Sequence, residues 1–309
     1  MKTKIWIALI ALYIVWGSTY LAIRFAVDTI PPFLHAGLRF LISGLILVIW
    51  RRAAGDAMPT RIQWRSLAII GTLLLLGGNS LVSVAEQTVA SGIAALIIGT
   101  VPLWLVLIEG IRPGGAKPSW RAIVGLIVGF SGIYLLIGPS ELTGKFQFDV
   151  LGTLLLVTAA FLWSLGSIYS RSAELPKSAL MMTGGEMLAG SIPIFIVSIA
   201  FGEWKSFHLA QVSSTSWIAL AYLIAFGSMV GFVAYIWLLQ NAPISLVATY
   251  AYVNPLVAVL LGNWFAREPL TARTLAAAGI IIGSVVFINW ARQAKVKTEP
   301  LQAVADGDD

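Results

Sequence analysis

Residues 93–111 read IAALIIGTVPLWLVLIEGI, and this run decides the fold class. A helix needs about 20 residues, at about 1.5 Å each, to cross a hydrocarbon core about 30 Å thick. The run is close to that length, and its one ionisable side chain, Glu109, lies near the end. We therefore predict that residues 93–111 cross a membrane as a helix.

Nine further runs of similar length and character occur along the chain. In order, the ten expected spans are residues 4–27, 33–50, 67–84, 93–111, 122–137, 150–169, 179–201, 217–239, 245–265 and 271–290. The composition agrees, because 58% of the residues are hydrophobic, only 11% are charged and the mean hydropathy is +0.88. Such values are typical of membrane proteins. The sequence therefore predicts an all-α membrane protein with ten transmembrane helices.

The distribution of basic residues predicts the orientation. Basic residues concentrate in cytoplasmic loops. With the N-terminus inside, the cytoplasmic segments hold 14 of the 20 Lys and Arg side chains: Lys2, Lys4, Arg51, Arg52, Arg61, Arg65, Arg112, Lys117, Arg121, Arg171, Lys177, Arg292, Lys295 and Lys297. We expect a multi-pass membrane protein with both termini in the cytoplasm, and a disordered cytoplasmic tail at residues 291–309.

The second half of the chain repeats the first. Offsets of 147, 153 and 154 residues align rare residue types in order, pairing Trp16 with Trp163, Gly37 with Gly184, Trp64 with Trp217, Gln87 with Gln240, and Gly125 and Gly129 with Gly279 and Gly283. Because each half holds five expected spans, an odd number, the second half runs through the membrane in the opposite sense. We expect the first repeat at residues 1–140 and the second at residues 141–290.

Inverted-repeat transporters bind their substrate near the midplane, where helices are interrupted at matching positions. Pro102 and Pro255 match under the offset of 153, and each removes an amide donor inside a span. We predict that they are hinges, and a static kink is the alternative. Close helix packing is expected at three Gly-x-x-x-Gly pairs, namely Gly125 with Gly129, Gly227 with Gly231, and Gly279 with Gly283.

Several short stretches are distinctive. Three of them are Trp16-Gly17-Ser18-Thr19-Tyr20, Ala36-Gly37-Leu38-Arg39-Phe40 and Ser91-Gly92-Ile93-Ala94-Ala95. They resemble the EamA family of the drug/metabolite transporter superfamily, and residues 84–87, 186–190 and 248–262 narrow the resemblance to its YedA-like branch. The resemblance implies two five-helix EamA repeats and export of small metabolites or drugs across the cell inner membrane. One departure is that the acidic turn Arg267-Glu268 has no acidic counterpart in residues 112–117.

Ionisable side chains inside membrane spans are costly and often functional. Arg39 and Glu186 occupy matching positions, since 186 − 39 = 147. Inversion leaves them separated by roughly 10 Å in depth. An ion pair, a role in an aqueous pathway together or separately, and snorkelling or bonds to backbone carbonyls therefore all remain open. Glu186 is the best candidate for proton coupling, and Glu86 lies at the end of a span.

A second set of candidates offers aromatic faces and hydrogen bonds to a substrate. These residues are Trp16, Ser18, Tyr20, Asn79, Trp163, Tyr250, Tyr252 and Asn254. Packing in the protein core is the alternative for each aromatic residue. The set predicts a small-molecule substrate that is amino-acid-like, aromatic or drug-like.

Motifs of other function classes are missing from the sequence. There is no H-E-x-x-H, no G-x-S-x-G and no phosphate-binding G-x-x-x-x-G-K-[ST], and the chain has no cysteine. The basic residues are scattered and do not form a face for nucleic acid. We therefore expect a secondary transporter, not an enzyme, with no cofactor or metal. A passive channel and an intramembrane enzyme acting on lipids are the alternatives, and the sequence leaves monomer and homodimer open.

Overall fold

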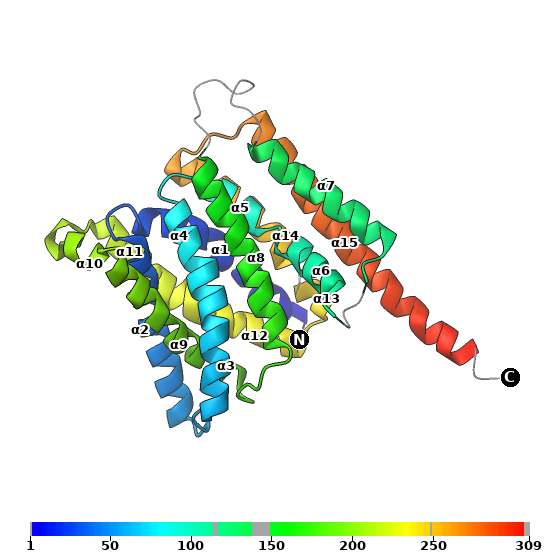
Figure 1. The fold of residues 1–309 in the computed structure, drawn as a ribbon, viewed down its shortest axis with the longest axis horizontal. Coiled ribbons are helices and arrows are strands. Elements are labelled where there is room, and N and C mark those ends of the chain that lie inside the picture. Colours follow the sequence, from blue (N-terminus) through cyan, green and yellow to red (C-terminus); the bar gives the residue numbers. More distant parts are fainter. Residues whose placement is uncertain (1, 114–116, 138–148, 248, 306–309) are drawn as a thin grey trace.

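The structure is a computed structural model that describes residues 2–113, 117–137, 149–247 and 249–305, and this part of the chain is all-helical (Figure 1). In chain order the elements are α1 (Lys2–Ala26), α2 (Pro32–Ala53), α3 (Arg61–Gly71), the π-helix η1 (Thr72–Ser80), α4 (Leu81–Ala85), α5 (Ser91–Ile98), α6 (Val101–Ile111), α7 (Trp120–Ile137), α8 (Val150–Ser170), α9 (Ala179–Ala200), α10 (Glu203–Ser206), the 3-10 helix η3 (Leu209–Gln211), α11 (Ser214–Tyr222), the π-helix η4 (Leu223–Val230), α12 (Gly231–Asn241), α13 (Ile244–Val247), α14 (Tyr250–Ala266) and α15 (Ala272–Ala305).

Seven stretches of the described chain are long and apolar enough to cross a membrane. Two further helices are apolar but shorter. The seven are Lys2–Ala26, Pro32–Ala53, Arg61–Ala85, Ser91–Ile111, Val150–Ser170, Ala179–Ala200 and Ser214–Leu239, and the shorter two are Trp120–Leu136 and Ala272–Ile288. The expected span 245–265 is divided between α13 and α14. The predicted all-helical membrane class is confirmed, whereas ten crossings in two repeats remain a prediction.

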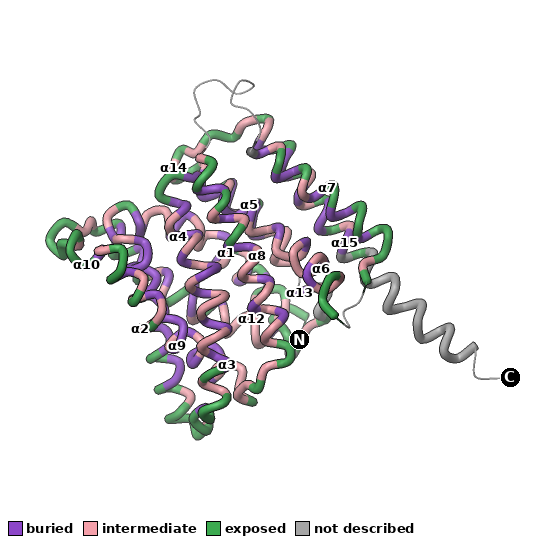
Figure 2. Tube along the Cα trace, viewed as in Figure 1, coloured by how far each residue is buried: buried purple, intermediate pink, exposed green. Residues whose placement is uncertain are grey.

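Large apolar side chains cover the outside of the bundle. Ile7, Ile127 and Leu151, for example, are 63%, 66% and 67% exposed. Figure 2 shows such exposed positions along the outer edges of the helices as well as at their ends. An apolar surface of this extent would be unfavourable in water but matches lipid chains. The bundle therefore has the surface of a protein that lies in a bilayer.

Two long helices contain a π-helical segment, η1 and η4. Adding 153 to the bounds of η1 gives residues 225–233, which overlap η4. The fourth expected span is interrupted between α5 and α6, at Gly99 and Thr100, and Pro102 lies in the first turn of α6. Pro255, by contrast, lies inside α14. Since π-helical turns are frequent at functional sites, these irregular segments indicate where a functional site is to be sought.

Helices from the two halves of the chain pack against each other in a reciprocal pattern. Two contacts join matching helices, α2 with α9 and α7 with α15, and the second pair forms one flank of the bundle in Figure 1. Helix α1 packs against η4, α12 and α14 of the second half, while α8 packs against η1, α5 and α6 of the first. Exchanging the two halves therefore reproduces these contacts.

Helix α15 differs from the expectation in two respects. It continues as far as Ala305, whereas the expected span ends at residue 290. The predicted packing role of Gly279 and Gly283 is wrong, since nothing lies within 4 Å of a Cβ atom added at either glycine. The α7 glycines Gly125 and Gly129 instead make the close contacts, with Ile288 and Ser284 of α15.

Candidate functional site

An aromatic cluster surrounds Trp16 of α1. The centroid of its ring lies 5.4 Å from that of Phe232, 5.2 Å from that of Tyr235 and 5.2 Å from that of Tyr250. The last two rings lie 5.7 Å from each other. These separations, with edge or tilted geometry, are those that aromatic side chains prefer. The structure thus brings together two predicted residues, Trp16 and Tyr250, and adds two that the sequence did not indicate.

A tryptophan from each half fills the space above a glycine of the other half. The indole Nε1 of Trp16 donates to the carbonyl oxygen of Gly227 at 3.2 Å, and a Cβ atom added at Gly231 would lie 2.2 Å from Nε1. In the reciprocal interface, a Cβ atom added at Gly78 would lie 2.7 Å from Cε3 of Trp163. The offsets agree with the repeat, since 163 − 16 = 147 and 231 − 78 = 153. Glycine is therefore required beside both tryptophans for close packing.

Arg39 lies on α2 and is 5% exposed. Its Nε donates to the Oγ of Ser228 in η4 at 2.9 Å. The ion pairs within the described residues join Arg51 to Asp56 and Arg171 to Glu109, at 2.8 and 3.9 Å. Arg39 and Glu186 thus form no ion pair here.

His35, Arg39 and Ser43 form a polar stripe on α2. The three are 0%, 5% and 0% exposed, and neither His35 nitrogen nor the Ser43 Oγ has a hydrogen-bond partner. Residues four apart lie on one face of a helix. The α9-facing side carries Gly37 and Gly44, which contact Phe195 and Leu188 of α9. At about 100° per residue, the polar stripe lies roughly on the opposite side of α2.

Glu86 is fully buried just after α4. Neither of its carboxylate oxygens has a hydrogen-bond partner in the structure. Nη1 of Arg24 donates to the backbone carbonyl of Glu86, and Arg24 and Glu268 are the charged groups that interact with its side chain. Tyr20 is close enough to interact electrostatically with the same carboxylate. Glu86, the second carboxylate noted in the sequence, is therefore buried within electrostatic reach of Glu268.

The other predicted binding residues lie in several places. Ser18 shares a hydrogen bond of 2.6 Å with the hydroxyl of Tyr222, and Tyr20 packs against the largest apolar cluster. Tyr252 packs against a separate apolar cluster that includes Leu103. The Oδ1 of Asn254 is buried without a partner. Asn79 lies in η1 beside the glycine that contacts Trp163.

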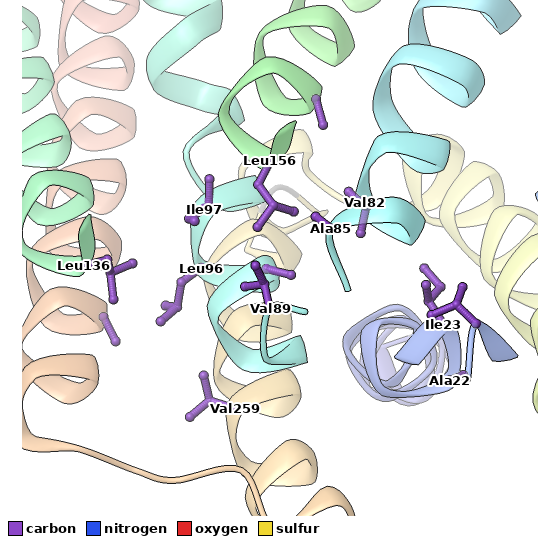
Figure 3. Close-up of a cluster of buried hydrophobic side chains, with 14 of the residues drawn as sticks. Ala22, Ile23, Val82, Ala85, Val89, Leu96, Ile97, Leu136, Leu156 and Val259 are labelled. Carbon is purple, nitrogen blue, oxygen red and sulfur yellow. The ribbon is translucent and has the colours of Figure 1, made fainter. Parts of the chain in front are cut away.

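The largest apolar cluster, against which Tyr20 packs, lies at the end of the bundle where α1 ends and α2 begins. We call this end the α1–α2 end. Figure 3 shows part of it, with Ala22, Ile23, Val82, Ala85, Val89, Leu96, Ile97, Leu136, Leu156 and Val259 labelled. The labelled residues belong to α1, α4, α5, α7, α8 and α14 and to the turn after α4, so both halves contribute. Burial of apolar side chains from both halves stabilises the closed arrangement of this end.

Two carboxylates from the second half cap helices of the first half at the α1–α2 end. Helix α2 has Pro31 at its N-cap and no side-chain cap of its own. Glu203 supplies the missing acceptors: Oε1 accepts from the backbone N–H of Phe33 at 3.1 Å, and Oε2 accepts from that of Leu34 at 2.7 Å and from the hydroxyl of Ser198 at 2.7 Å. A carboxylate at a helix N-terminus also interacts favourably with the helix dipole.

Glu268 does the same for α5, whose N-cap residue Ala90 makes no side-chain bond. Its Oε1 accepts from the backbone N–H of Ser91 at 2.7 Å and its Oε2 from that of Gly92 at 3.1 Å. A Cβ atom added at Gly262 would lie 2.2 Å from Oε2, so this glycine makes room for the carboxylate. The acidic turn noted in the sequence thus ties the end of α14 to the start of α5.

The opposite end of the bundle carries the counterpart of Glu203. Gly55-Asp56 and Gly202-Glu203 match, since 202 − 55 = 147, and both glycines have positive φ, at 95° and 74°. Asp56, however, accepts from Nε and Nη2 of Arg51 at 2.8 and 3.0 Å. These bonds, with a further one from Ser178, lower the pKa of Asp56 to about 2. Ser178 caps α9 itself, so α9 does not need the carboxylate that α2 needs.

The sequence profile of the EamA-like transporter family matches the chain twice, over residues 3–138 and 150–290. The chain belongs to this family. The chain is 39% identical to the inner membrane transporter YedA of Escherichia coli K12 over 283 residues, which is 91% of this chain and 89% of that protein. It is 25% identical to the transporter YvbV of Bacillus subtilis over 295 residues, 95% and 94% of the two chains.

Two more distant matches extend the comparison of this EamA-like chain. A WAT1-related chloroplastic protein of Arabidopsis thaliana is 24% identical over 290 residues, 92% of this chain and 69% of that protein. A chain in a solved crystal structure superposes with a TM-score of 0.61, at 21% identity, and the match covers 92% and 96% of the two chains. The last comparison supports the fold. Together, the family and the names of the relatives support a multi-pass membrane transporter.

Several residues of this EamA-like chain that hold the candidate site together were not predicted from the sequence. Glu203, Ser228 and His35 were not among the candidate site residues. The repeated Gly-acidic pair at residues 55–56 and 202–203 is a signal for Glu203. A second is Pro31, which cannot cap α2 and so requires an acceptor from elsewhere.

Proposed function

We propose that this EamA-like transporter exports small metabolites or drugs across the inner membrane by alternating access between two inverted repeats. The observation that carries the proposal is the reciprocal tryptophan–glycine contact between the halves, Trp16 with Gly231 and Trp163 with Gly78. An arrangement that is preserved when the halves are exchanged is what an inverted repeat requires. The two separate matches to the family profile agree with it.

In this proposal, access to the transport site alternates between the two ends of the bundle when the two halves exchange their conformations. At the α1–α2 end, Glu203 and Glu268 join helices across the halves, while at the other end Asp56 bonds mainly to Arg51 of its own half. Opening the α1–α2 end therefore requires these two carboxylates to leave the backbone amides of α2 and α5. The break at Gly99, between α5 and α6, and the π-helices offer the local flexibility that such a change needs.

The substrate pathway in this proposal lies between α1, α2, η1, η4 and α14. Trp16 and Tyr250 offer aromatic faces on one side, and Trp163 lies on the other. Asn254 offers a buried amide oxygen without a protein partner. Glu186 and Glu86 are the candidates for linking transport to a proton, because each is an ionisable group inside or at the edge of a span. Pro102 and Pro255 remain the candidate hinges.

Location and direction rest on two further observations. The E. coli relative is named an inner membrane transporter. The distribution of basic residues favours a cytoplasmic position for both termini, and in that orientation the α1–α2 end faces outward. A transporter without a nucleotide-binding motif takes its energy from a gradient, and net export follows when the substrate is made inside the cell.

An efflux screen tests the proposal. Cells that overproduce the protein are expected to resist, and to export, at least one compound among amino acids, aromatic metabolites and cationic drugs. Trp16→Ala is expected to lower efflux about tenfold, because three ring contacts of about 0.5–1.5 kcal/mol each are lost. Gly283→Ala is the control, because its neighbourhood is open.

Purified protein in proteoliposomes separates the alternatives. A coupled carrier accumulates substrate against its gradient and shows counterflow, whereas a passive channel only equilibrates it. Equal efflux from cells with and without the protein, for every compound that enters the cell, would contradict the transport proposal. Conversion of a lipid by the purified protein would instead favour the intramembrane enzyme.

A further inference from the structure

Arg39 is a cation without a counter-charge among the described residues. It lies inside α2, is 5% exposed, donates one hydrogen bond from Nε to Ser228, and has its Cζ 5.0 Å from the centroid of the Phe40 ring. No carboxylate of the described residues lies within 4.0 Å of it, and the two ion pairs there involve other residues. A buried charge without a counter-charge is strongly unfavourable. Retaining arginine here therefore needs a reason other than stability.

The surroundings of Arg39 leave part of its guanidinium free to bind. Because Nε is held by Ser228, the outer pair of N–H groups, on Nη1 and Nη2, points away from that bond. Gly227 lies beside this pair, since a Cβ atom added there would be 3.3 Å from Nη2. Any larger residue would crowd the group. The π-helix η4 thus holds the guanidinium through Ser228 and packs against Nη2 through Gly227, while neither Nη1 nor Nη2 donates a hydrogen bond to a described residue.

The same stripe of α2 carries two more buried polar groups without partners. His35 and Ser43 lie one turn to either side of Arg39, and both are 0% exposed. A buried polar group without a hydrogen-bond partner is unfavourable. Together with Arg39 they form a polar stripe on the side of α2 that faces away from α9, and Arg39 joins this stripe to η4 through Ser228.

We propose that Arg39 is the anion-binding group of the transport site and that the substrates carry a carboxylate. The two outer N–H groups of a guanidinium match the two oxygens of a carboxylate in a planar, bidentate arrangement. One guanidinium balances one carboxylate charge, whereas a phosphate dianion would need a second cation. His35 and Ser43 then offer hydrogen bonds to the rest of the molecule. This inference rests on the proposed transport function and narrows its substrate class.

A binding assay tests the proposal apart from transport. The melting temperature of purified protein is measured with phenylacetate, succinate and N-acetylglycinate, and with the neutral amide of each. At least one acid is expected to raise the melting temperature by several degrees, and its amide to do so much less. At concentrations about 100 times the dissociation constant, bound ligand stabilises by about 2.7 kcal/mol.

Three variants assign the effect to Arg39. Arg39→Met is expected to abolish the acid-dependent shift while its melting temperature without ligand stays equal to wild type or rises, because a buried charge is removed. Arg39→Lys keeps the charge but loses the planar pair of N–H groups, so the acid-dependent shift in melting temperature is expected to fall several-fold. Ser228→Ala keeps the guanidinium but not its orientation, with an intermediate loss. A lower melting temperature in Arg39→Met, with the acid-dependent shift unchanged, would show a structural role and overturn the proposal.

The remaining outcomes are also decisive. If no acid stabilises the protein more than its amide does, the proposal is overturned, whatever the efflux screen shows. If anionic phosphatidylglycerol in nanodiscs abolishes the shift and stabilises wild type but not Arg39→Met, the guanidinium binds a lipid headgroup and the proposal is overturned. Acid binding without efflux or counterflow would instead leave Arg39 as the binding group and contradict the transport function.

Discussion

Replacing Glu203 by alanine is expected to lower the free energy of unfolding by about 3 kcal/mol. The buried carboxylate accepts three hydrogen bonds, from two backbone N–H groups of α2 and from the hydroxyl of Ser198. Pro31 cannot replace it as a cap. Reversible unfolding of the purified protein in mixed micelles, with a graded proportion of SDS, measures the change.

Asp56→Ala is the matched control for Glu203→Ala, because Asp56 is the counterpart of Glu203 at the other end. Its ion pair with Arg51 is partly exposed to solvent, so the expected loss is below about 1 kcal/mol. Glu203→Gln, which keeps the shape of the side chain but not its charge, is expected to fall between the two. Equal losses for the alanine variants at positions 203 and 56 would mean that the cap on α2 is not a special contact.

Gly71→Ala is expected to destabilise the protein by about 2 kcal/mol or more, through overpacking. A Cβ atom at Gly71 would lie 2.6 Å from the carbonyl oxygen of Glu186 and 2.8 Å from both Cα and N of Gly190. All three are backbone atoms, so no side chain can turn aside and α3 must move away from α9. The better helix propensity of alanine, about 1 kcal/mol, offsets only part of this cost. Thermal unfolding in detergent is the measurement.

The crossing of α3 and α9 also places Glu186, so transport is expected to fall together with stability in Gly71→Ala. Gly283→Ala is the matched control. Nothing lies within 4 Å of its added Cβ atom, and the melting temperature is expected to stay unchanged or rise slightly. A Gly71→Ala protein as stable as the Gly283→Ala protein would refute the close contact between α3 and α9.

Much of the architecture is readable from the sequence because the bilayer imposes simple rules. Length and apolarity alone locate the helices, and α8, for example, begins at Val150 as expected and ends one residue beyond the expected end. Rare residues such as Trp16 and Trp163 reveal the internal repeat, because chance rarely aligns tryptophans. The location of the helices and the similarity of the two halves could thus be predicted without a structure.

Contacts between helices were less accessible, because they depend on which faces meet. Gly279 and Gly283 have the spacing of a packing motif, but the side of α15 that faces α7 carries Ile288 and Ser284. Glu203 acts on a helix that lies about 170 residues earlier in the chain. No local signal in the sequence shows which helix a distant carboxylate will cap.

The candidate site illustrates the same limit. The matching positions of Arg39 and Glu186 are visible in the sequence, but matching by inversion does not mean contact. The partner of Arg39 is Ser228, which is one of many serines in the chain. Its selection depends on the π-helical turn of η4, and the sequence carries no clear signal for that turn.

The inversion of the two halves is tested most directly by labelling single cysteines. The natural chain has no cysteine, so no background residue needs removal. Ala54 and Phe201 match, since 201 − 54 = 147; both are exposed, and each follows the second helix of its half. In intact cells, a membrane-impermeant maleimide is expected to label Phe201→Cys but not Ala54→Cys, and both after permeabilisation. Labelling of both variants in intact cells, or of neither, would contradict the inverted arrangement.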